Sequence, residues 1–362
     1  MKVLIGGGGT GGHIYPALAL ARYAMAVDQG NSVLFIGSAN GLESKIVPSA
    51  GFDIQIIPAR GLQRNFKGFF SVVKDLFGGI RQSGKVIKSF RPNVVLGTGG
   101  YVAAPVVLSA LLKRYPVVLH EQNALPGLTN RWLAPFVKKV CLSFKETEKK
   151  MPRFSRTAYT GNPRASEVLS LTREEGIRFF NLNPDRKTLL IYGGSRGAMK
   201  LNQVVSDYLN DGMHPESLNL IYVSGEIYYR DISEKIGVLP QNVRLFPYLE
   251  QMPEALAAAD LAITRSGATT LAEITALGLP AILIPSPNVV NNHQYFNARL
   301  LSDVGAAVLI EEKDFDSNRL QFEINRLFDQ PDLLEEMSRQ SKILGIPDAA
   351  ERLYGCLQEV AS

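Results

Sequence analysis

The chain has 362 residues, longer than one hydrophobic core usually organises, and its 46% hydrophobic and 20% charged residues are typical of a globular protein. Residues 1–162 carry 21 Lys and Arg against 7 Asp and Glu, whereas residues 163–362 carry 18 against 27. This asymmetry predicts that one half faces an anionic surface, with DNA, RNA and anionic lipid as candidates. Two cysteines, Cys141 and Cys356, exclude a disulfide framework and are expected to be buried free thiols.

The N-terminus enters a predicted strand at residues 1–5, which leaves no room for a signal peptide. The longest apolar run, residues 99–112, ends at Lys113 and Arg114 and is shorter than the roughly 20 residues that a spanning helix needs. We therefore expect a soluble or peripheral protein.

Short apolar runs alternate with helical patterns along the whole chain, which predicts parallel sheets with crossover helices. The expected strands begin at Lys2, Ser32, Asp53, Asn93, Pro116 and Lys139, and then at Thr188, Leu218, Asn242, Leu261, Pro280 and Ala306. The predicted fold class is α/β, with two Rossmann-like doubly wound domains facing a cleft. We place the domains at residues 1–162 and 163–362, with a last helix able to pack back on the first domain.

Glycine-rich turns follow several of these strands, and such turns let backbone amides approach an anion at a helix N-terminus. They occupy residues 6–12, 97–100, 193–197 and 266–270. A dinucleotide site would need an acid at the end of the second strand, where Gly37 and Ser38 stand instead. No Walker lysine follows any of the turns, so ATP hydrolysis is disfavoured. The turns favour another ligand that carries a pyrophosphate.

Two ionisable residues stand beside these turns. His13 follows the first turn near a helix start, where the helix dipole favours a neutral imidazole able to accept a proton; simple helix capping is the alternative. Glu273 lies one turn into a later helix, where it can bind a ribose diol or face solvent. His and Cys show no metal-ligand spacing, and Asp314-Phe315-Asp316 is interpreted as a helix cap.

Seven motifs, in this order and spacing, resemble one family over essentially the whole chain. It is the bacterial N-acetylglucosaminyltransferase family that converts undecaprenyl-diphospho-N-acetylmuramoyl-pentapeptide into the disaccharide lipid precursor of peptidoglycan. The motifs are residues 7–16 (GGGTGGHIYP), 100–102 (GYV), 120–123 (HEQN), 161–164 (GNPR), 193–198 (GGSRGA), 265–268 (RSGA) with Glu273, and Gln294 with Asn297-Ala298.

The resemblance implies a glycosyltransferase-B fold that transfers N-acetylglucosamine with inversion from UDP-N-acetylglucosamine to the acceptor's 4-hydroxyl. It implies that the C-terminal domain holds the donor and the N-terminal domain the lipid acceptor. Carried over by motif, the donor contacts are Thr10, Gly11, Gly12, Asn123, Arg164, Ser195, Leu249, Ala268, Thr269, Thr270, Leu271, Ala272, Glu273 and Gln294. In this scheme Leu249 lies beside the uracil and Glu273 binds the ribose.

Inversion requires a single displacement, for which we expect His13 as the base and Glu121 as the alternative. Backbone amides, Ser195 and Arg164 are expected to meet the charge on the leaving diphosphate, with no metal or other cofactor.

The basic half contains an apolar stripe at helical spacing that is flanked by Lys and Arg. Phe66, Phe69, Phe70 and Lys74 are its predicted membrane contacts, with core packing as the alternative. We therefore expect a peripheral protein on the cytoplasmic face of the bacterial inner membrane, with an anionic membrane surface and a cell-wall synthesis complex as partners.

Three other functions are compatible with parts of the sequence. Another UDP-sugar glycosyltransferase with a lipid acceptor is the nearest alternative. A nicotinamide-dependent oxidoreductase is disfavoured because no acid ends the second strand. A nucleic-acid-binding protein is motivated by the basic half but lacks a recognised fold or aromatic stacking motif, so no nucleic-acid partner is expected.

Overall fold

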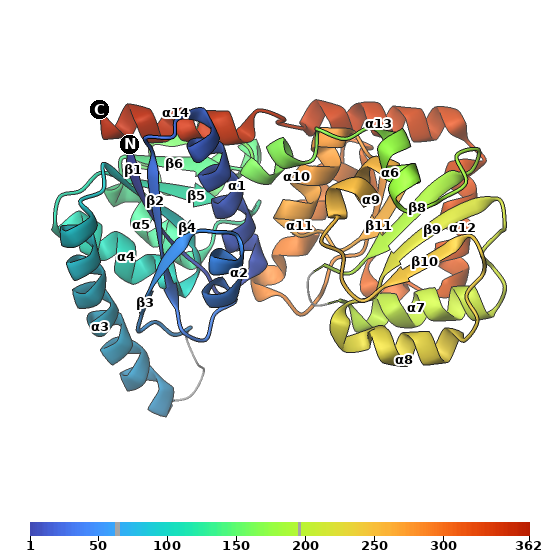
Figure 1. The fold of residues 1–362 in the computed structure, drawn as a ribbon, viewed down its shortest axis with the longest axis horizontal. Coiled ribbons are helices and arrows are strands. Elements are labelled where there is room, and N and C mark those ends of the chain that lie inside the picture. The colour runs from blue at the N-terminus through green and yellow to red at the C-terminus, as the bar shows by residue number, and fades with distance from the viewer. Residues whose placement is uncertain (62–65, 195–196) are drawn as a thin grey trace. The chain divides into compact units, whose positions relative to one another are not determined.

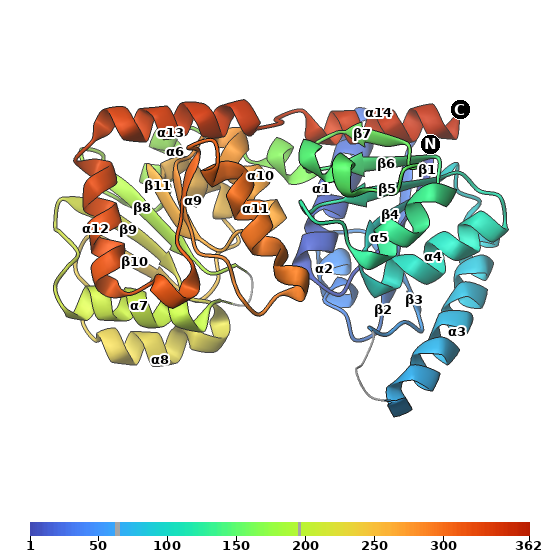
Figure 2. The ribbon, with the colours of Figure 1, turned by 180° about the vertical axis from the view of Figure 1, so that it is seen from behind.

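The structure, a computed structural model, describes residues 1–61, 66–194 and 197–362, with the backbone alone for residues 66–72. The chain forms two compact units. Unit 1 comprises Met1–Ser166 and Asp348–Ser362, and unit 2 comprises Glu167–Pro347. Each unit contains one sheet with helices on both faces (Figures 1 and 2).

The sheet of unit 1 is wholly parallel and has the strand order β3-β2-β1-β4-β5-β6-β7. Its strands are β1 (Lys2–Gly7), β2 (Ser32–Ser38), β3 (Asp53–Ile57), β4 (Val94–Gly99), β5 (Val117–Glu121), β6 (Lys139–Leu142) and β7 (Thr157–Tyr159). The helices of this part are α1 (Gly11–Val27), α2 (Glu43–Ser49), α3 (Phe66–Phe90), α4 (Gly100–Leu112), α5 (Leu128–Leu133), η1 (Ala134–Phe136), η2 (Lys145–Lys150), η3 (Pro163–Glu167) and α14 (Ala349–Ala361).

Alternate residues of β1 explain how this sheet is covered. Val3 and Ile5 face one cluster that includes Leu357 of α14, while Leu4 faces a second cluster that includes Val106 of α4. All of these side chains are buried, so the strands read as unbroken apolar runs. The C-terminal helix α14 packs beside α1 on the first face (Figures 1 and 2).

Unit 2 repeats the arrangement with the strand order β10-β9-β8-β11-β12-β13, again wholly parallel. Its strands are β8 (Lys187–Tyr192), β9 (Leu218–Val223), β10 (Val243–Phe246), β11 (Leu261–Thr264), β12 (Ala281–Leu283) and β13 (Ala307–Leu309). Its helices are α6 (Arg173–Phe179), α7 (Met199–Asn210), α8 (Glu226–Ile236), α9 (Met252–Ala258), α10 (Ala268–Leu277), η4 (Val290–Asn292), α11 (His293–Ser302), η5 (Glu312–Asp314), α12 (Ser317–Phe328) and α13 (Pro331–Leu344).

The strand order reverses at β1 in unit 1 and at β8 in unit 2, because each of these strands lies between its successor and a later strand. In doubly wound sheets, ligands bind outside the carboxyl ends of the strands at such switch points. Glycine turns follow both of these strands, so the topology places the sequence motifs where a ligand is expected. The predicted fold class, two doubly wound α/β domains, is confirmed.

Candidate active site

The first glycine turn joins β1 to α1, and its residues Gly7, Gly8 and Gly9 leave no room or suitable backbone conformation for a side chain. A Cβ on Gly7 would lie 1.9 Å from Thr98 Oγ1, and one on Gly8 would lie 2.3 Å from the carboxyl carbon of Glu43. Gly9 has a φ of +87°, which L side chains rarely adopt. The N-cap residue Thr10 makes no side-chain cap, so the first amides of α1 remain available to an anion. The predicted donor contacts Thr10, Gly11 and Gly12 all lie at this helix start.

A buried carboxylate holds the turn from behind. Glu43, only 1% exposed, accepts hydrogen bonds from Gly9 N at 2.8 Å and from Ser38 N and Oγ at 2.9 and 2.7 Å. Sequence reasoning missed this residue, although Glu43 follows the second strand closely. Because its oxygens are engaged inside the unit, Glu43 does not present the free acid that a dinucleotide ribose requires.

His13 lies in the first turn of α1, and its ring lies against the backbone at the end of β4. Its Nδ1 is 2.8 Å from the Thr98 carbonyl oxygen, which can only accept, so Nδ1 carries a proton and Nε2 is the unprotonated nitrogen of a neutral ring. A Cβ on Gly99 would lie 3.0 Å from the imidazole Cε1, and Gly99 and Gly100 have φ values of +93° and +75°. Glycines at both positions therefore let the ring approach the chain.

The residues that end β5 form a buried hydrogen-bond network. His120 is fully buried, and burial lowers its pKa from 6.5 to about 4. Its neutral ring accepts at Nδ1 from Gln122 Nε2 and donates from Nε2 to Gly161 O, each at 3.2 Å. Gln122 Nε2 also donates to the Thr98 carbonyl at 2.8 Å. His120 and Gln122 thus support the carbonyl that orients His13.

Glu121 is buried and accepts three close hydrogen bonds. They come from Asn123 N at 3.0 Å, Gly127 N at 2.9 Å and Asn130 Nδ2 at 2.9 Å. These bonds fold the loop after β5 toward α5 and place Asn123 at its start. The carboxylate of Glu121 is therefore occupied in shaping a loop.

Arg164 belongs to unit 1 and lies against the first helix. Its guanidinium carbon is 5.8 Å from the centre of the Tyr15 ring on α1, and its backbone amide donates to Asn162 Oδ1 at 3.2 Å. A stacked guanidinium is well suited to meeting phosphate charge. The structure thus brings Arg164 into the same unit as the glycine turn and His13.

In unit 2, the loop after β11 is tied to the loops after β12 and to α11. Arg265 donates to Ile284 O at 3.0 Å and pairs with Glu312. Ser266 Oγ donates to Gln294 O at 2.8 Å. The side-chain oxygen of Gln294 accepts from Ser286 N at 2.8 Å, which directs its NH₂ group away from that loop. Gln294 therefore has donors left for a ligand.

Helix α10 begins without a side-chain cap, because its N-cap is Gly267. The predicted run Ala268, Thr269, Thr270, Leu271, Ala272 and Glu273 forms the first six residues of this helix. Thr269 Oγ1 is buried and has no hydrogen-bond partner among the described residues. Glu273 is 5% exposed, so it is not a solvated helix face; Leu271 is fully buried and can offer a ligand only its backbone.

Two further predicted contacts stand apart from this helix start. Leu249 is buried in the loop between β10 and α9, and β9 and β8 separate β10 from β11 in the sheet. Ser195 lies outside the described residues. The neighbouring turn is nonetheless tight, since a Cβ on Gly197 would lie 2.4 Å from Ser224 O.

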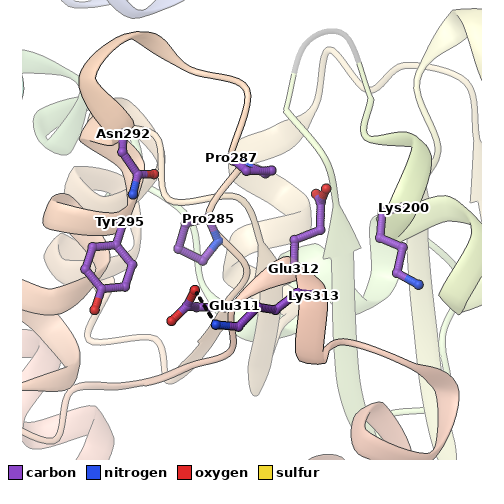
Figure 3. Close-up of a pocket in the computed structure, with 8 residues that line it drawn as sticks. All are labelled: Lys200, Pro285, Pro287, Asn292, Tyr295, Glu311, Glu312 and Lys313. Carbon is purple, nitrogen blue, oxygen red and sulfur yellow. Dashed lines mark ion pairs between the residues drawn. The ribbon is translucent and has the colours of Figure 1, made fainter.

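A pocket of about 350 Å³ opens beside these loops of unit 2 (Figure 3). It is lined by Lys200, Pro285, Pro287, Asn292, Tyr295, Glu311, Glu312 and Lys313. None of these residues belongs to the predicted donor contacts. Its charges are largely paired internally, Glu311 with Lys313 at 3.4 Å and Glu312 with Arg265. The predicted run 268–273 at the start of α10 therefore does not line this pocket.

In the part of the chain that the structure describes, no cluster of three or more His, Cys, Asp or Glu could hold a metal ion. Asp316 is the N-cap of α12 and accepts from Arg319 N at 2.7 Å, which confirms the interpretation of the Asp-Phe-Asp segment as a cap.

The predicted membrane stripe lies on α3. Lys74 and Phe77 are exposed, whereas the side chains of Phe66, Phe69 and Phe70 lie outside the described residues. A second apolar surface was missed from the sequence. Trp132 and Phe136, on α5 and η1, are 77% and 71% exposed. Among the described helices, none combines the length and apolar character needed to cross a bilayer.

The chain belongs to glycosyltransferase family 28. The family's N-terminal domain matches residues 3–142 and its C-terminal domain matches residues 188–353. These two matches fall on unit 1 and unit 2, so the family's two domains correspond to the two doubly wound sheets.

Full-length relatives narrow the class. The chain is 45% identical to the UDP-N-acetylglucosamine–N-acetylmuramyl-(pentapeptide) pyrophosphoryl-undecaprenol N-acetylglucosamine transferase of Halalkalibacterium halodurans, covering 100% of both chains. It is 42% identical to the Bacillus subtilis protein of the same name, covering 99% of both. Among solved structures, MurG of Acinetobacter baumannii matches with a TM-score of 0.76 and 29% identity over 99% of each chain. These findings confirm the resemblance expected from the motifs.

Proposed function

We propose that this chain transfers N-acetylglucosamine from UDP-N-acetylglucosamine to undecaprenyl-diphospho-N-acetylmuramoyl-pentapeptide, forming the disaccharide lipid precursor of peptidoglycan. The names of its full-length relatives supply the two substrates. The observation that carries the chemistry is the oriented imidazole of His13, which stands at an uncapped helix start with Nδ1 bound to the Thr98 carbonyl.

The reaction is a single displacement that inverts the anomeric carbon. His13 Nε2 takes the proton from the acceptor's 4-hydroxyl as that oxygen attacks C1 of the sugar and UDP departs. His13 is preferred over Glu121 because the Glu121 oxygens already accept three close hydrogen bonds within unit 1. Moving a proton onto Glu121 would disrupt the loop that those bonds hold.

The donor is proposed to lie against unit 2 at the start of α10. The uncapped amides of α10 and the hydroxyls of Thr269 and Thr270 bind the diphosphate. Glu273 binds the ribose, and Leu249 lies beside the uracil. Gln294 donates a hydrogen bond to the sugar. Thr10, Gly11, Gly12 and Asn123 are the donor contacts proposed on unit 1. Charge on the leaving diphosphate is met by helix amides, Ser195 and Arg164, so the reaction requires no metal or other cofactor.

The lipid acceptor places the enzyme on the cytoplasmic face of the bacterial inner membrane as a peripheral protein. The basic excess of residues 1–162 favours an anionic leaflet. Among the described side chains, we propose that the leaflet is contacted by Lys74 and Phe77 on α3. Trp132 and Phe136 form a second contact, and the exposed Arg131 and Lys138 are close to them in the sequence. Phe66, Phe69 and Phe70 extend this contact by their place on α3. A cell-wall synthesis complex is the proposed protein partner.

The direct test is transfer of labelled N-acetylglucosamine from UDP to a lipid-diphosphate muramoyl acceptor, with and without EDTA. Labelled disaccharide lipid should form equally in both conditions. Absence of product with active acceptor refutes the transferase proposal, and product that disappears only with EDTA refutes the metal-free mechanism. Parallel titrations with NADH and a short oligonucleotide should show no binding.

A further inference from the structure

The two cysteines of the chain meet in the core of unit 1. Cys141 lies on β6 and is fully buried, and Cys356 lies on α14 and is partly exposed. Both belong to the apolar cluster that joins α14 to the sheet. The two thiols are free, and their side chains are hydrogen-bonded to each other. Residues far apart in the chain are thus within reach of one another.

A second contact fixes the register of strand and helix at this point. Lys139 and Cys141 are two residues apart on β6 and so lie on one face of the sheet, while Cys356 and Glu359 are three apart on α14 and lie on one face of the helix. Lys139 Nζ forms an ion pair with the Glu359 carboxylate. The ion pair and the thiol pair are therefore neighbouring links between the same two elements.

The surroundings make the two thiols chemically unequal. The hydrogen bond from Cys141, followed by the positive charge of Lys139, lowers the pKa of Cys356 to about 7 against the opposing effect of its partial burial. The hydrogen bond to Cys356 and burial raise the pKa of Cys141. Near neutral pH a substantial fraction of the partly exposed sulfur is accordingly the nucleophilic thiolate, and the buried sulfur keeps its proton.

We propose that Cys356 and Cys141 form a redox-modification site that takes hydroperoxides and closes to a disulfide between α14 and β6. The Cys356 thiolate attacks the peroxide O–O bond; with one proton taken up, this gives a sulfenic acid and one water from hydrogen peroxide. The Cys141 sulfur then displaces the hydroxyl group, which leaves as water with the Cys141 proton. Two thiols lose two electrons in total, and the peroxide accepts them.

The site is independent of the transferase chemistry, since neither cysteine is among the proposed substrate contacts. Its two thiols lie between two packed elements, so the bond would attach the C-terminal helix covalently to the sheet of unit 1. A reducing thiol would reverse it by exchange at the partly exposed sulfur.

The test treats the full-length protein with hydrogen peroxide and maps its peptides without reduction. Wild type should yield one intramolecular cross-link between the Cys141 and Cys356 peptides, with a mass lower by two hydrogens, and dithiothreitol should remove it. In Cys141→Ser, oxidation should stop at a Cys356 sulfenic acid that dimedone traps. In Cys356→Ser, the folded protein should leave Cys141 unreacted.

Peptide mapping of the wild-type protein alone tests the proposal, so the test does not depend on whether the variants fold. Oxidation of Cys356 to a sulfinic acid while Cys141 stays a free thiol would overturn it, as would a cross-link between two molecules. Two thiols that remain titratable after denaturation of the peroxide-treated protein would also overturn it. Circular dichroism of each serine variant checks that its fold is retained.

Discussion

Unit 1 and unit 2 share a doubly wound topology but carry different residues at their topological switch points. In unit 1, two buried carboxylates and two imidazoles surround the turn and the strands beside it: Glu43, Glu121, His13 and His120. In unit 2, the corresponding loops are tied by Arg265, Ser266 and Gln294, and helix α10 presents amides, hydroxyls and Glu273. In the proposed reaction, His13 of unit 1 takes the proton and the start of α10 in unit 2 binds the diphosphate and ribose of the donor.

The largest expected effect comes from removing the proton acceptor of unit 1. His13→Ala should lower kcat roughly 10³-fold and leave the affinity for UDP-N-acetylglucosamine nearly unchanged, because a positioned base acts mainly in the transition state. Steady-state kinetics with the lipid acceptor and calorimetric titration of the donor measure the two quantities.

A matched variant distinguishes the role of His13 as a base from its role as a hydrogen-bond donor to the Thr98 carbonyl. In His13→Asn, the side-chain amide takes the place of Nδ1–H toward the Thr98 carbonyl, but nothing replaces Nε2. We expect kcat to stay as low as in the alanine variant. Recovery of turnover in His13→Asn would assign His13 a structural role and return Glu121 to consideration as the base.

The second effect concerns stability and compares one imidazole in each unit, the fully buried His120 and the half-buried His214. His120 in unit 1 and His214 in unit 2 both have pKa values lowered by burial from 6.5 to about 4. Below pH 6.5 the unfolded chain binds a proton that the folded chain does not, so the free energy of unfolding falls as the pH drops from 6.5 to 4. For His120 the loss should approach roughly 3 kcal/mol.

Amide hydrogen exchange of peptides from β5 and β9 measures the stability of unit 1 and unit 2 separately. His120→Gln should weaken the acid sensitivity of β5, and His214→Gln that of β9. Equal protection of β5 at pH 7 and pH 4.5 in the wild type would contradict a neutral buried His120.

The third effect lies in the donor-binding unit. Glu273→Ala should weaken UDP binding about tenfold or more, since a carboxylate that accepts from a ribose diol contributes charge-assisted hydrogen bonds. Glu273→Gln, which keeps the size and one acceptor, should fall between the wild type and alanine. Glu335→Gln on the exposed surface of α13 is the control, and unchanged UDP affinity in Glu273→Ala would remove the ribose contact.

The smallest effect compares exposed aromatic side chains in the two units. Trp132→Ala with Phe136→Ala should weaken binding to anionic vesicles about tenfold, because each ring loses apolar area placed in the interface. Phe322→Ala on α12 of unit 2 should leave vesicle binding unchanged, although Phe322 is also exposed. Flotation with anionic and neutral vesicles measures the binding of both variants. An equal loss of vesicle binding in the two variants would show that the membrane contact is not specific to unit 1.

Much of the fold follows from local patterns. The expected strands begin within one residue of the observed ones, because the mostly buried strands of parallel sheets form short apolar runs bounded by turn residues. Strand β7 was missed since it is an edge strand of three residues, Thr157–Tyr159, with no buried side chain to mark it. The motif residues at the starts of α1 and α10 were likewise readable, because helix N-termini and glycine turns have local signatures.

The sequence by itself determined the two-sheet architecture, the glycine turns and the family, since these depend on periodicity and on residues close together in the chain. Only the tertiary structure decided that His120 is buried, that Glu43 turns back onto Gly9, and that Cys356 lies against Cys141. Burial and partnership depend on which distant elements pack together. A side chain's charge state and reactivity depend on those neighbours, and no local pattern specifies them.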